Sequence, residues 1–214
     1  LFSRDSACLQ ELIGLMMLQK HRTLVLWAFD CAQLPLERLE SKYPKEQRPR
    51  AAVEECRAWA EAHIKMMPAK RAILEAHAAA KEIDDPAAAA LCHAVGHAGA
   101  TVHVETHALG LVFYELTAIV LENKNDYEAP VLDKIKYYHD RLLYWQEHTD
   151  GSNRTWATFL LDDSRPNKEK LLAEKRKKLT PAELKAHDTP EVDRTPEQHQ
   201  LVAQSQEKLM VTHM

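Results

Sequence analysis

The chain has 214 residues, which suits one domain, or one domain with an appendage, and is long enough to bury a core. It has only five glycines, many alanines and almost no alternation of apolar and polar residues, so it is predicted to be an all-α protein. The net charge of −4 excludes a broad cationic surface for nucleic acid and does not favour an acidic partner either.

The cysteines and the apolar runs indicate the compartment. No Cys-x-x-Cys pair occurs, and each cysteine lies singly in an apolar context, as is typical of buried free thiols in a reducing compartment. We therefore expect a cytoplasmic protein. The apolar stretch 12–18 is too short to span a bilayer and is flanked by charge, so we expect no membrane partner. The four cysteines are Cys8, Cys31, Cys56 and Cys92.

In the first half of the chain, apolar residues recur every three or four positions, which is typical of helices with one buried face. We expect helices over about 6–19 and 20–42, the second interrupted near 33–34 because Pro35 cannot continue it. Prolines in the first turn then open helices over 49–64 and 68–83. Because the connectors are short, the helices are expected to pair as antiparallel hairpins of a single multi-helix bundle.

The second half begins with a helix that opens at Pro86. Unbroken, it would run to residue 123, which is long for a globular protein, so a break is predicted near 99–102 or near Gly110. The strongly apolar stretch 111–121 is expected in the core or, as an alternative, at the interface of a homo-oligomer. A further helix is predicted over 130–148, and residues 156–160 form a short amphipathic piece that can close the core.

The composition changes at Asp162. Residues 162–214 carry ten Lys or Arg and ten Asp or Glu, with no Phe, Tyr or Trp. They hold too few apolar side chains for an independent core, although Thr180–Glu183 and Thr195–Gln198 have the spacing of helix capping boxes. We predict a core domain over 1–161 and a charged, partly helical extension over 162–214.

Four histidines lie within fifteen residues, as the pairs His93/His97 and His103/His107. Residues four apart share one helix face, so each pair can offer two imidazoles to one ion. At about 1.5 Å per residue, His93 and His107 would be roughly 21 Å apart on a straight helix. One site made of all four histidines is therefore excluded unless the helix bends.

Zinc normally takes at least three protein ligands, so a third must come from elsewhere. An antiparallel hairpin that turns near residues 84–85 would bring His77 level with Cys92 and His93. Glu105 points away from His103 on an ideal helix, so it is a poor third ligand, and the zinc-protease signature is not matched.

Three interpretations of these histidines remain open: structural or partner-facing side chains, a divalent metal site such as zinc, and acid–base catalysis near neutral pH. Gly96, Gly99 and the many alanines indicate close helix packing, which favours the first. The sequence contains no nucleophile motif, phosphate-binding glycine loop or dinucleotide fingerprint. We therefore assign no catalytic residue and lean against an enzyme.

A set of short segments occurs in a characteristic order between residues 20 and 161. They are Trp27–Ala32, Lys42–Lys45, Arg48–Arg50, Ala58–Ala60, Ala76–Ala79, Gly96–His97, Ala100–Gly110, Tyr144–Trp145 and Trp156–Leu161. Together they resemble the bacterial putative immunity protein family of polymorphic toxin systems. The resemblance implies an all-α cytoplasmic protein that binds and neutralises a cognate protein toxin, with no established catalytic residue. The tail from Asp162 departs from the family pattern.

The family pattern also bears on the site. It includes Asp30, Cys31, Arg48, Trp59, His77, His97, His103 and His107, and it leaves His93 out. We expect any metal ligands to be His77, His97, His103 and His107, and a candidate pocket to involve Asp30, Trp59 and His93. The leading function is a soluble, toxin-immunity-type binding protein that acts by occlusion. The alternative is a metal- or histidine-dependent enzyme with its site on helix 93–107.

Overall fold

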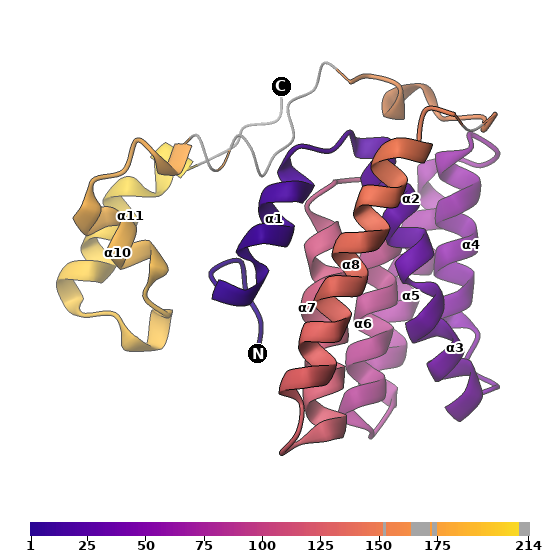
Figure 1. Ribbon diagram of the computed structural model, residues 1–214, viewed down its shortest axis with the longest axis horizontal. Helices are drawn as coiled ribbons and strands as arrows, with labels where there is room; N and C mark the ends of the chain where they lie inside the picture. Colours follow the sequence, from indigo (N-terminus) through magenta and orange to yellow (C-terminus); the bar gives the residue numbers. More distant parts are fainter. Residues whose placement is uncertain (152, 164–171, 173–174, 210–214) are drawn as a thin grey trace. The chain divides into compact units, whose positions relative to one another are not determined.

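The computed structural model describes residues 1–151, 153–163, 172 and 175–209 (Figure 1). Its regular elements in these ranges are all helices, which confirms the predicted all-α class. The chain forms two compact units, Leu1–Arg165 and Pro166–Met214. No helix in the described ranges is both long enough and apolar enough to cross a bilayer.

The helices of the first half follow the predicted order. A 3-10 turn at Ala7–Leu9 leads into α1 (Gln10–Met17), followed by α2 (His21–Cys31), α3 (Gln33–Lys42), α4 (Arg48–Ala60) and α5 (Met66–Glu82). The helices α2 and α3 meet at Ala32, which confirms the predicted interruption. Pro35 lies in the first turn of α3, where its missing N–H is not needed.

The end of α4 was predicted wrongly, at about residue 64, whereas the helix stops at Ala60. Ala62 adopts a left-handed φ of 61°. The N–H of His63 donates to the carbonyl of Ala58, and that of Ala62 to the carbonyl of Trp59. These two bonds form a Schellman motif, which usually has glycine at the left-handed position. Because alanine takes that position here, the sequence carried no glycine signal for the end of the helix.

The second half of the first unit contains α6 (Pro86–Ala100), α7 (His107–Asn123), α8 (Glu128–His148) and a 3-10 turn at Thr158–Leu160. The Asp85 side chain caps α6 by accepting a hydrogen bond of 3.1 Å from the N–H of Ala87. The turn between α6 and α7 spans residues 101–106, which confirms the first predicted break. Gly110 lies inside α7, so the alternative position of the break is wrong.

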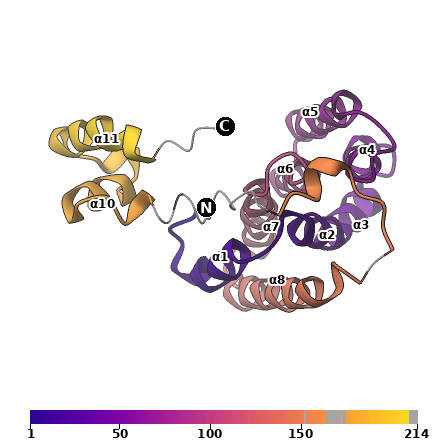
Figure 2. The same cartoon turned by 90° about the horizontal axis from the view of Figure 1, so that it is seen from above.

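The helix α6 occupies the middle of this unit, in contact with α2, α3, α4, α5 and α7 (Figures 1 and 2). Small residues make such a position possible. A Cβ atom on Gly99 would lie 3.0 Å from the Cys56 sulfur and 3.4 Å from the Ala52 carbonyl oxygen of α4. The glycine therefore allows the two helices to approach closely.

The predicted core role of residues 111–121 agrees with their burial. Leu111 and Leu116 are completely buried within the unit, so this face of α7 is already used inside one copy of the chain. A homo-oligomer stays a prediction. Three of the cysteines are buried free thiols as expected, whereas Cys8, in the 3-10 turn that precedes α1, is exposed.

A buried ion pair joins α7 to α8. Lys134 Nζ lies 2.6 Å from Glu115 Oε1, and the two side chains are only 9% and 2% exposed. The Tyr138 hydroxyl donates to the other oxygen of Glu115. Trp27 of α2 completes the network by donating its indole N–H to the Tyr138 carbonyl, 2.9 Å away.

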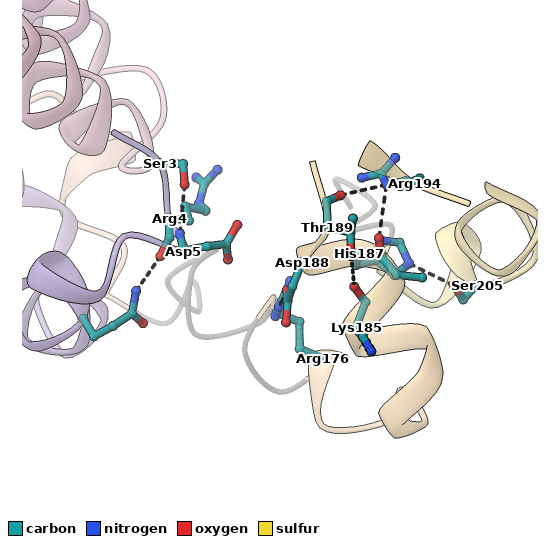
Figure 3. Close-up of polar contacts among 12 residues, drawn as sticks. Ser3, Arg4, Asp5, Arg176, Lys185, His187, Asp188, Thr189, Arg194 and Ser205 are labelled. Atoms are coloured by element: carbon teal, nitrogen blue, oxygen red, sulfur yellow. Dashed lines mark hydrogen bonds and ion pairs between the residues drawn. The ribbon is translucent and has the colours of Figure 1, made fainter. Parts of the chain in front are cut away.

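The second unit contains a helical hairpin, α10 (Pro181–Asp188) and α11 (Pro196–Leu209). Both predicted capping boxes form, at Thr180/Glu183 and Thr195/Gln198. Polar contacts tie the hairpin together, as Figure 3 shows. The side chains of His187 and Ser205 lie 2.8 Å apart, and the Arg194 guanidinium donates to two backbone carbonyls, of Ala186 and Thr189.

Truncating one member of the buried ion pair should cost far more than replacing both. We expect Lys134→Ala to lower the free energy of unfolding by about 3–5 kcal/mol, because it leaves the Glu115 carboxylate buried without its cation. Lys134→Met combined with Glu115→Leu and Tyr138→Phe, which removes the hydroxyl that donates to Glu115, should be much less destabilising. Urea unfolding measures both, and equal losses in the two variants would contradict the prediction.

Candidate functional site

Five ring side chains from α5, α6 and α7 lie in mutual contact: His77, His93, His97, His107 and Tyr114, here called the ring cluster. The Nδ1 atoms of His77 and His93 are 2.8 Å apart, and those of His97 and His107 are 3.1 Å apart. The Tyr114 ring centroid lies 4.9 Å from that of His93 and 5.3 Å from that of His97. Each ring is half-buried or at the edge of exposure.

Local sequence explains how the rings meet. His93 and His97 are four residues apart on α6 and so share a face. The hairpin of α5 and α6 brings His77 level with His93, which confirms the contact predicted from the turn near 84–85.

Two glycines leave space for the rings. A Cβ atom on Gly96 would lie 2.8 Å from Cε1 of His77, and one on Gly110 would overlap the His97 ring. The sequence suggested close backbone packing at Gly96 and Gly99. Gly99 does allow it, whereas at Gly96, as at Gly110, the neighbour is an imidazole ring.

Burial keeps His77, His93 and His97 uncharged at neutral pH. Burial and, to a smaller extent, the neighbouring His107, His77 and His93 together lower the pKa of His97 to about 4. Burial is also the main cause of the lowered pKa values of His77 and His93. At neutral pH these rings are therefore neutral. A neutral imidazole has one donor and one acceptor nitrogen, so within each pair one Nδ1–H can donate to the other Nδ1.

His103 lies apart from the ring cluster. It is exposed in the turn after α6, and its ring centroid is 6.2 Å from that of Trp59, which in turn packs against Phe159 at 5.3 Å. Of the predicted metal set, the structure thus brings together His77, His97 and His107. His93 is the fourth histidine in contact with them, because α6 ends before His103.

Among the residues that the structure describes, no three His, Cys, Asp or Glu side chains are arranged to hold a metal ion. The contacts of the clustered histidines are pairwise instead. A divalent metal site at His77, His97, His103 and His107 stays a prediction from the sequence. Metal analysis of protein purified without a histidine tag tests it.

Asp30 lies in a groove that has a volume of about 460 Å³. Its Oδ2 atom accepts hydrogen bonds from Arg141 Nε at 2.6 Å and from Trp145 Nε1 at 2.8 Å. Trp59 and His93 do not line this groove, so the three residues of the predicted pocket lie in separate places. The groove is lined by Leu26, Phe29, Asp30, Gln33, Arg50, Val53, Glu54, Arg57, Trp145 and Arg154.

Adding one methyl group beneath the rings should destabilise the protein. We expect Gly110→Ala and Gly96→Ala each to lower the free energy of unfolding by about 1–3 kcal/mol, because an imidazole must move. Gly14→Ala is the matched control: its Cβ would meet nothing within 4 Å, so a gain of up to about 1 kcal/mol is expected in α1. Urea unfolding measures all three. Similar losses at Gly14 and Gly110 would contradict this account of the glycines.

Acid should destabilise the protein through the ring cluster. The pKa of His97 is about 4 in the folded state against about 6.5 when unfolded, so the unfolded state binds the proton more readily. Stability is therefore complete above about pH 6.5 and falls towards pH 4, by up to about 1.4 kcal/mol per pH unit for one such histidine.

Urea unfolding of metal-free protein at about pH 7.5 and about pH 5 measures this loss. The loss should be smaller in His97→Gln. His63→Gln, which changes an exposed histidine after α4, should behave like wild type. An equal loss in His97→Gln and wild type would show that another group is responsible.

Comparison with known proteins identifies the family. No match was found among curated proteins or among solved structures. The family model described as Imm-5 like putative immunity protein matches residues 14–141, which is more than half of the chain. The matched region runs from α1 into α8 and contains the whole ring cluster together with Asp30. The chain belongs to the Imm-5 like putative immunity protein family.

Proposed function

We propose that this protein binds a cognate protein toxin and neutralises it by covering the toxin's functional site, without chemistry of its own. The family match over residues 14–141 carries this proposal, because it supports an immunity-type role for the bundle itself. A cytoplasmic location is part of the proposal. The free thiols of Cys31, Cys56 and Cys92 support it, since such thiols are typical of reducing compartments.

The architecture suits binding by occlusion. Association costs entropy whenever loops or side chains must be ordered, so a preformed surface binds more tightly than a flexible one. In the first unit, the helices that present the surface share one core, and α6 is packed on several sides. We therefore expect the toxin to meet a surface whose backbone changes little on binding.

No observation favours the alternative, a metal- or histidine-dependent enzyme. In the ring cluster, His77 faces His93 and His97 faces His107, so the imidazole nitrogens contact one another rather than a nucleophile. General base catalysis needs the base within hydrogen-bond reach of the group that it deprotonates. The binding function is therefore the one that we test.

The direct probe of the proposal is a candidate protein toxin taken from the genes that flank this one, here called the neighbouring toxin. We expect the purified full-length chain and that toxin to form a stoichiometric complex in isothermal titration calorimetry. Equimolar protein should abolish the toxin's activity. Because occlusion leaves the toxin chemically unchanged, its mass should be unaltered and its activity should return when the complex is separated.

A toxin from a different immunity pair serves as the control and should not bind. Absence of measurable affinity for the neighbouring toxin would count against the proposal. A lasting covalent change in the toxin would count against occlusion and in favour of the enzyme alternative.

A further inference from the structure

The groove beside Asp30, here called the arginine groove, concentrates cations on a chain whose net charge is negative. Three arginines line it: Arg50 and Arg57 on α4, and Arg154 in the segment after α8. Arginine and tryptophan are the residue types most enriched among those that dominate binding energy at protein interfaces. The groove contains both, since Trp145 also lines it.

The three arginines differ in their partners. Arg50 forms a two-fold hydrogen-bonded pair with Glu40, at 2.7 and 2.8 Å. The Arg57 guanidinium lies 5.2 Å from the ring centroid of Phe29, as a cation–π contact. In the part of the chain that the structure describes, neither Arg57 nor Arg154 forms an ion pair with a carboxylate. Two guanidinium groups of the lining therefore keep their charge-assisted hydrogen-bonding capacity for a ligand.

The acidic residues that line the groove, Asp30 and Glu54, do not form ion pairs with Arg57 or Arg154. Asp30 is held by Arg141 and by the indole of Trp145. This arrangement also orients Trp145 at the edge of the groove. Glu54 is exposed and forms no ion pair within the described residues. Counting Asp30 and Glu54 against the three arginines leaves a lining charge of +1 (3 − 2).

We propose that the arginine groove is the toxin-binding site and that it takes an acidic segment of the toxin, with its carboxylates on Arg57 and Arg154. This inference rests on the proposed function and adds to it the chemistry of the contact. Guanidinium and carboxylate form paired hydrogen bonds. Arg57 is half-buried, so its pair with a carboxylate would be stronger than in open solvent, whereas Arg154 is exposed.

The size of the groove favours a peptide segment over a free small anion. Its volume of about 460 Å³ falls in the range of about 300–1,000 Å³ that is typical of pockets for drug-sized ligands, which is larger than a single small anion. One carboxylate between two arginines would fill only part of it. The side chains next to the carboxylates in the toxin segment would then contact Trp145, which is half-buried.

Calorimetric titration of the full chain with the neighbouring toxin tests the site. Arg57→Gln and Arg154→Gln should each weaken binding by about tenfold, and the double variant by more. Arg57→Lys, which keeps the charge, should retain part of the affinity.

Arg71→Gln changes an exposed arginine of α5 outside the groove and should bind within about twofold of wild type. Raised salt should weaken wild type more than the double variant. Circular dichroism confirms that each variant is folded.

A second probe tests the binding chemistry of the arginine groove independently of the toxin. It is a fluorescein-labelled peptide of alternating glutamate and phenylalanine, compared in anisotropy titrations with the same peptide carrying glutamine for glutamate. Wild type should bind only the acidic peptide, and the double variant should bind neither. If the toxin does not bind but the acidic peptide does, the preference of the groove for acidic segments stands, whereas its role as a toxin-binding site falls together with the immunity function.

Two results would overturn the inference. One is toxin binding that is equally tight in wild type and in the double variant, which would leave the proposed function intact at another surface. The other is the absence of binding to both the toxin and the acidic peptide.

Discussion

The close packing of α6 against its neighbours is the constraint on which the rest of the structure depends. It works because side chains are missing at defined places: Gly99 lets α4 approach, and Gly96 and Gly110 leave room for imidazole rings from α5 and α6. A helix surrounded in this way cannot shift without displacing several others, since protein interiors are packed nearly as densely as crystals. The ring cluster is thus a consequence of how α5, α6 and α7 pack.

Buried polar side chains inside the bundle also contact one another, as hydrogen-bonding or ionic partners. The imidazoles of the ring cluster face one another in pairs, whereas the buried charge of Glu115 is met by Lys134 and Tyr138. A buried pair of this kind is weak evidence for added stability, but breaking it is costly. It ties α8 to α7 and, through Trp27, to α2. Two of the helices that this network joins, α2 and α8, also contribute residues to the arginine groove.

The arginine groove shows how a local surface can differ from the whole molecule. A net charge of −4 describes the average, but recognition depends on the charges within a Debye length of the ligand, about 8–10 Å in physiological salt. Arg57 and Arg154 come from α4 and from the segment after α8, far apart along the chain. Family membership supports an immunity-type role, and the groove suggests which chemistry that role would use.

The sequence by itself determined the helical class, most of the helices, the caps at Thr180 and Thr195, and the contact between His77 and His93, because spacing and turn length are local properties. It did not determine the end of α4, where Ala62 takes a position usual for glycine. Nor did it determine that His107 meets His97 while His103 lies apart, beside Trp59. Only the turn after α6 decided that His93, rather than His103, joins the ring cluster. The arginine groove likewise exists only in the folded chain, since no pattern along the sequence relates Arg57 to Arg154.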